Sequence, residues 1–130
     1  MKIHHVGIAV KSAEEAAARF GALLGLEKGA RYELPELGVT ALFLPVADSN
    51  LELLEPIGED STVAKFLEER GEGLHHVCFE VDDIEASREK VAGAGLSPTP
   101  VFDFLETRVP CRMFFLEDPD GNRVEMIEYV

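Results

Sequence analysis

The stretch that decides the fold is HHVGIAV, residues 4–10, because it returns later in the chain as HHVCFEV, residues 75–81. Four of the seven positions are identical in the two copies. A helix start, apolar residues at helical spacing and a terminal glycine follow each copy. The closing segments also match, since LELLE at residues 51–55 aligns with VEMIE at residues 124–128. The sequence therefore contains two copies of one strand–helix–strand–strand–strand unit.

This repeat predicts an α+β fold, in which two tandem βαβββ modules form one curved, barrel-like mixed sheet with helices outside. Neither half alone has enough material for a large core, so we expect a single domain over residues 1–130. Module 1 covers about 1–57, a linker with a short helix about 58–72, and module 2 about 73–130. The expected strands lie near 2–10, 27–34, 38–45, 50–56, 74–81, 99–104, 111–117 and 123–129, and the expected helices near 13–24, 63–69 and 83–94.

Composition excludes some classes of partner. The chain of 130 residues has 25 acidic and 12 basic residues, a formal net charge of −13. Such a surface repels nucleic acid and anionic membranes, so we expect neither as a partner. No signal-like segment leads the sequence, no apolar run is long enough to span a bilayer, and the two cysteines lack a disulfide spacing. These features predict a cytoplasmic protein.

Strand alternation singles out four polar side chains. In the first strand of each copy, the second histidine of the pair points away from the apolar face that should carry the helix. In the closing strands, one glutamate per copy points the same way. If the modules join around a pseudo-twofold axis, these four side chains meet: His5, Glu52, His76 and Glu125.

Two imidazoles and two carboxylates are typical of a divalent metal site. Zinc, nickel, cobalt, manganese and ferrous iron suit this mixed set better than calcium or copper(I). Four protein ligands in an octahedral shell leave two open positions for a substrate. A lone strand histidine or glutamate is more often hydrogen-bonded or solvated, but four at repeat-equivalent positions favour a metal site. His4 and His75 fall on the other face, where partial burial at a strand start is expected.

Three segments resemble the vicinal oxygen chelate superfamily, which includes glyoxalase I, extradiol dioxygenases and antibiotic-resistance proteins. They are HHVGIAV at residues 4–10, PELGVTALFLP at 35–45, and the stretch from LELLEP to VDDIEA at 51–86. The last of these is most similar to the methylmalonyl-CoA epimerase family. The resemblance places that family's metal ligands on the four residues reached by alternation, with cobalt preferred. It also places a catalytic base on Glu36, which by sequence alone is a loop acid.

The resemblance implies a homodimeric, metal-dependent isomerase. Its reaction would interconvert the C2 stereoisomers of methylmalonyl-CoA, or of a similar acyl thioester, by proton abstraction and return through a metal-stabilised enolate. Two bases are needed on opposite faces of the carbon. Glu36 and Glu125 are the candidates, with Glu125 serving also as a ligand.

The last third departs from the epimerase pattern. Residues 102–129 lack the family's Gly-rich, Lys-containing stretch, and DPDGN at 118–122 is more similar to general glyoxalase and dioxygenase members. Arg108 and Arg112 are candidate anion contacts there, although a solvated role is the ordinary one for such residues. The alternatives are a glyoxalase I-like lyase acting on a glutathione hemithioacetal, a non-haem iron extradiol dioxygenase and a metal-free binding protein.

Overall fold

The computed structural model describes residues 1–130 and divides them into two compact units. One unit is His5–His75, and the other combines Met1–His4 with His76–Val130. The units follow the two sequence repeats, with the linker helix in the first. That the repeats form a single domain stays a prediction. No helix has the length and apolar character needed to cross a membrane.

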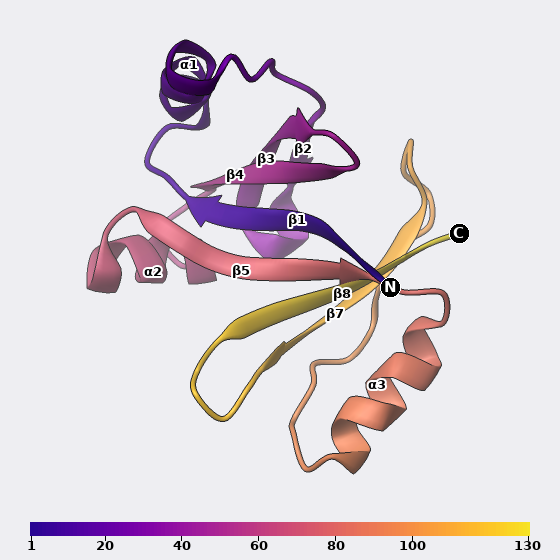
Figure 1. The fold of residues 1–130 in the computed structure, drawn as a ribbon. Helices are drawn as coiled ribbons and strands as arrows, with labels where there is room; N and C mark the ends of the chain where they lie inside the picture. The colour runs from indigo at the N-terminus through magenta and orange to yellow at the C-terminus, as the bar shows by residue number, and fades with distance from the viewer. The chain divides into compact units, whose positions relative to one another are not determined.

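The first unit has the βαβββ order expected of module 1, followed by the linker helix (Figure 1). Its strand order is β2-β3-β4-β1, antiparallel except for the parallel pairing of β1 with β4. Only the first residues of β1 fall outside this unit. The elements are β1 (Lys2–Ala9), α1 (Ala13–Leu24), β2 (Arg31–Leu34), the 3₁₀ turn η1 (Pro35–Leu37), β3 (Val39–Val46), β4 (Ser49–Pro56) and α2 (Thr62–Arg70).

The second unit repeats this arrangement. Its strand order is β5-β8-β7-β6, and its first and last strands again pair in parallel. Parallel neighbours need a crossover connection, which the helix after the first strand supplies in both units. The predicted repeat of βαβββ modules and the α+β class are therefore confirmed. The elements are β5 (Gly73–Glu80), α3 (Ile84–Gly93), β6 (Phe102–Phe104), β7 (Cys111–Glu117) and β8 (Arg123–Tyr129).

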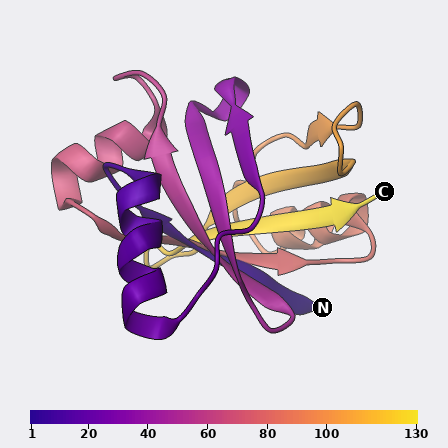
Figure 2. The same cartoon turned by 90° about the horizontal axis from the view of Figure 1, so that it is seen from above.

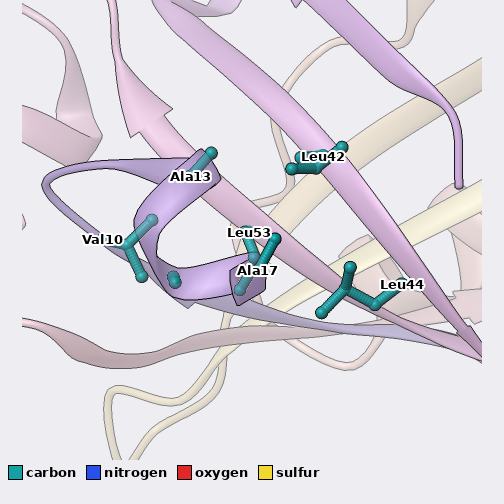
Figure 3. Packing of buried hydrophobic residues seen from close by; sticks show 7 residues of the cluster. Val10, Ala13, Ala17, Leu42, Leu44 and Leu53 are labelled. Atoms are coloured by element: carbon teal, nitrogen blue, oxygen red, sulfur yellow. The ribbon is translucent and has the colours of Figure 1, made fainter. Parts of the chain in front are cut away.

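Helix α1 forms the core of the first unit with the strands beside it (Figure 2). Ser12 caps its first turn, since the Ser12 Oγ accepts a hydrogen bond from the Glu15 backbone N–H at 3.2 Å. Gly25 ends it in the left-handed conformation, at φ 71°. The alanines on its buried face are small, so the helix approaches the strands closely. This cluster contains Val10, Ala13, Ala16, Ala17, Leu42, Leu44 and Leu53 (Figure 3).

Helix α2 covers the other face of the same sheet. Its Val63 and Phe66 pack against Ala9 and Leu54, which alternation places on the face away from α1. The linker helix therefore lies on the same face of these strands as His5. In the second unit, α3 packs through Ile84 onto β7 and β8, as the predicted helix-facing side requires.

Two edge strands are shorter than predicted. The strand expected from residue 27 begins at Arg31, because the Gly29 N–H donates to the Phe43 carbonyl at 2.7 Å outside the regular ladder. The strand expected from residue 99 begins at Phe102, where two preceding prolines lack backbone donors. The turn η1 was not predicted; it ends at Gly38, whose φ is 68°. The remaining boundaries agree with the predictions within one residue.

Candidate metal-binding pairs and catalytic carboxylates

The first unit buries an imidazole beside a carboxylate. His5 on β1 and Glu52 on β4 lie with Nε2 3.3 Å from Oε1, and their side chains are 2% and 8% exposed. The parallel register sets Gly7 directly opposite Glu52.

The second unit contains the equivalent pair. His76 on β5 and Glu125 on β8 lie with Nε2 3.1 Å from Oε2, and both side chains are 6% exposed. Here Cys78 is opposite Glu125 in the register and is fully buried. In each unit the structure therefore places the predicted histidine and glutamate side by side. That the two pairs assemble into one site stays a prediction.

The chemistry of each pair fits a divalent metal. Burying a carboxylate costs free energy unless a partner compensates its charge, and a bound cation can do so. A divalent cation bound to a pair would compensate the charge of its carboxylate and use the Nε2 lone pair of its histidine. The donor atoms are nitrogen and oxygen, as zinc, cobalt, nickel, manganese and iron accept.

An aromatic side chain lies opposite each glutamate on the neighbouring antiparallel strand. Phe43 on β3 faces Glu52, and Phe115 on β7 faces Glu125. The Phe43 ring is perpendicular to that of His5, with centroids 5.5 Å apart and planes at 81°. The sequence prediction did not single out these phenylalanines, which come nine residues before Glu52 in one repeat and ten residues before Glu125 in the other.

Glu36 lies on η1, between β2 and β3, and is exposed. Its carboxylate is accessible to a molecule arriving from solvent, and it is not part of the buried His5–Glu52 pair. Its predicted role as a base stays a prediction.

The first histidine of each pair has a different environment, as expected. The His4 Nε2 lies 2.7 Å from the Tyr129 hydroxyl oxygen, and the His75 ring packs against Phe66 with centroids 5.0 Å apart. Both are half-buried, which agrees with the prediction for strand starts.

Arg112 is engaged within its own unit. Its guanidinium donates to Asp103 Oδ1 at 2.7 Å and to Glu85 Oε1 at 2.6 Å. These carboxylates raise the pKa of Arg112, Asp103 more than Glu85, and they leave it poorly suited to bind a ligand's anion. Arg108 is exposed in the β6–β7 loop and remains the candidate anion contact.

The chain matches a family model along most of its length. Residues 4–115 match the model of the Glyoxalase/Bleomycin resistance protein/Dioxygenase superfamily. The ethylmalonyl-CoA/methylmalonyl-CoA epimerase of Cereibacter sphaeroides is 44% identical over 95 residues, 72% of this chain and 71% of that protein. Mitochondrial methylmalonyl-CoA epimerase of Homo sapiens is 41% identical over 66% of this chain, and the aligned region is 49% of the human protein.

A solved structure extends the similarity to the last third. Streptomyces coelicolor methylmalonyl-CoA epimerase in complex with 2-nitronate-propionyl-CoA aligns with a TM-score of 0.88 and 29% identity, covering 98% of this chain and 96% of that one. The fold is thus shared even where residues 102–129 depart from the epimerase sequence pattern. The chain belongs to the glyoxalase/bleomycin resistance protein/dioxygenase superfamily and, within it, to the methylmalonyl-CoA epimerase family.

Proposed function

We propose that this protein is a metal-dependent epimerase that interconverts the C2 stereoisomers of methylmalonyl-CoA or a similar acyl thioester. The observation that carries the proposal is the buried His–Glu pair present in each module of a chain 44% identical to an ethylmalonyl-CoA/methylmalonyl-CoA epimerase. A non-catalytic binding protein would have no need to bury two such pairs.

The four paired residues would hold the metal, with cobalt preferred over zinc, manganese, nickel or iron. His5 and His76 would each offer the Nε2 lone pair, and Glu52 and Glu125 one carboxylate oxygen each. This requires the two modules to join in one curved sheet, as predicted from the repeat. When bound, the metal would stabilise negative charge on the substrate's thioester and carboxylate oxygens.

Two carboxylates of the chain would move the proton. Glu36 would accept the proton from C2. The electron pair of the broken C–H bond would then be delocalised into the thioester carbonyl. Glu125, protonated, would return a proton to the opposite face of the carbon. The inverted product then has the same atoms as the substrate, and exchange with water restores the starting protonation of both carboxylates.

The proposal also covers the substrate class, the location, the oligomeric state and the partners of the protein. The substrate is a small acyl thioester, the protein is a cytoplasmic homodimer, and neither nucleic acid nor membrane is a partner. The net charge of −13 supports the last point, because it disfavours polyanionic surfaces.

Deuterium uptake at C2 of methylmalonyl-CoA tests the proposal. The substrate is followed by NMR in heavy water, with protein stripped of metal and with the same protein reloaded with cobalt. We expect uptake and loss of stereochemistry only after reloading. Absence of uptake by protein that holds one metal per chain would overturn the proposal, and glutathione hemithioacetals would then test the glyoxalase alternative. Oxygen consumption by iron-loaded protein on a catechol would identify the dioxygenase alternative.

A further inference from the structure

The Phe43 side chain contacts two other rings of the first unit. It is perpendicular to His5, at 5.5 Å and 81°, and to Tyr32, at 5.9 Å and 80°. Phe43 also lies directly opposite Glu52 in the strand register. One aromatic residue therefore borders both members of the His5–Glu52 pair.

Two hydrogen bonds connect the backbone of Phe43 to the segment that precedes β2. The Gly29 N–H donates to the Phe43 carbonyl at 2.7 Å, and the Phe43 N–H donates to the Ala30 carbonyl at 2.9 Å. A Cβ at residue 29 would lie 3.0 Å from that carbonyl oxygen and 3.0 Å from the Pro45 ring. Glycine thus permits the close approach that fixes Phe43.

We propose that Phe43 is a positioning residue, which sets the plane of the His5 imidazole so that its Nε2 lone pair is aimed at the metal. The inference rests on the proposed function for the presence of a metal. The χ2 torsion of histidine is broad, so its rotamer does not fix the ring plane. Because the metal-binding lone pair lies in that plane, a perpendicular neighbour at van der Waals range restricts its direction before the metal arrives.

The second unit provides a matched control. Phe115 occupies the position equivalent to Phe43, opposite Glu125, but its ring packs against Phe102 with centroids 5.9 Å apart. A substitution at Phe115 removes the same volume beside a proposed ligand without removing a ring that orients a histidine.

Cobalt titration of the variants Phe43→Leu and Phe115→Leu tests the inference. An aromatic pair of this kind corresponds to about a three- to tenfold change in an equilibrium constant. We therefore expect Phe43→Leu to weaken cobalt binding by about that factor and to change the visible d–d spectrum of the bound ion. Phe115→Leu should retain the wild-type spectrum, and Phe43→Tyr, which keeps a ring, should restore it.

NMR of histidine side chains in the metal-free protein gives a readout that does not depend on the metal. Removing the Phe43 ring should shift the His5 ring signals, by loss of its ring current, and broaden them. If Phe43→Leu does not fold, Gly29→Ala, which presses on the Phe43 carbonyl, should produce a smaller change of the same kind.

Wild-type affinity and spectrum in Phe43→Leu, or unchanged His5 signals, would overturn the inference. An equal loss of cobalt affinity in Phe115→Leu would also overturn the inference. It would indicate that removing either phenylalanine disturbs the packing around the metal ligands in general. Cobalt binding by the wild type without epimerisation contradicts only the proposed function, whereas no cobalt binding by the wild type contradicts both.

Discussion

Glu55, near the end of β4, accepts a hydrogen bond from the backbone N–H of Ala13, the first residue of α1, at 3.0 Å. The second unit has the same link, because Glu128 Oε2 accepts from the Ile84 N–H at 2.7 Å. Each carboxylate satisfies a free donor at a helix N-terminus and complements its partial positive charge. Each also lies three residues after a proposed metal ligand, so one strand serves the metal pair and fixes the helix on the opposite face.

Removing either carboxylate should destabilise its helix. We expect Glu55→Ala and Glu128→Ala each to lower the free energy of unfolding by about 1 kcal/mol, as for the loss of an N-cap. Urea unfolding followed by circular dichroism measures the change. Glu69→Ala, at an exposed site on α2, is the control and should be nearly neutral. Equal stabilities for all three variants would show that the two hydrogen bonds contribute nothing.

Adjacent histidines should differ in their effect on the metal. His76→Ala removes a proposed nitrogen ligand and should abolish both stoichiometric cobalt binding and isotope exchange. His75→Ala alters a side chain that packs against Phe66 and should retain the metal. Metal analysis after gel filtration compares the two. Full occupancy in His76→Ala would remove His76 from the ligand set.

Glu36→Gln should separate metal binding from proton transfer. The amide keeps the size and polarity of the side chain but cannot accept the proton, so we expect exchange at C2 to fall by at least about a hundredfold. Because Glu36 is exposed and outside the buried pairs, cobalt affinity should be unchanged. Near-wild-type exchange in this variant would exclude Glu36 as the base.

Cys111 should make stability depend on alkaline pH. Burial, and to a lesser extent the charge of Glu125, raises the pKa of its thiol from 9.0 to about 11. Because the folded pKa lies above the unfolded value, the stability contribution of the neutral thiol is complete below pH 9.0 and is lost as the pH rises through about 11. We expect Cys111→Ala to unfold with a weaker dependence on pH across that interval.

Alkylation gives a second measurement on Cys111. At pH 8 iodoacetamide should modify it slowly in the folded protein and rapidly in urea, since the thiolate is the nucleophile. Mass spectrometry of peptides distinguishes it from Cys78. Rapid modification of folded protein would contradict a raised pKa.

Alternation along four strands was enough to predict the contents of both buried pairs. It worked because His5 and Glu52 lie on strands whose other face packs against a helix, so apolar neighbours such as Leu53 fix the direction of each side chain. The same rule puts Glu55 on the apolar face beside Leu53, although the sequence prediction assigned this residue no role. The structure shows that it accepts a hydrogen bond from the helix start at Ala13.

Other features depended on contacts that local sequence does not encode. Gly29 and Thr99 read as strand residues, yet both bond to a phenylalanine on the next strand in an irregular pattern, Gly29 to Phe43 and Thr99 to Phe115. The position of α2 on the His5 side of the sheet followed from the packing of Phe66, which helical spacing alone does not orient. In each case the local sequence is compatible with more than one structure, and contacts with residues distant in the sequence decide which one forms.

The parallel pairing of the first and last strands in each unit has a consequence for biosynthesis. A growing chain carries its imidazole from the start of a module, but the matching carboxylate arrives only with the final strand. A fragment that ends before residue 49 has His5 without Glu52, and one that ends before residue 123 has His76 without Glu125. Because the proposed metal site needs both pairs, metal uptake during translation would wait until the last strand of the second module has been made.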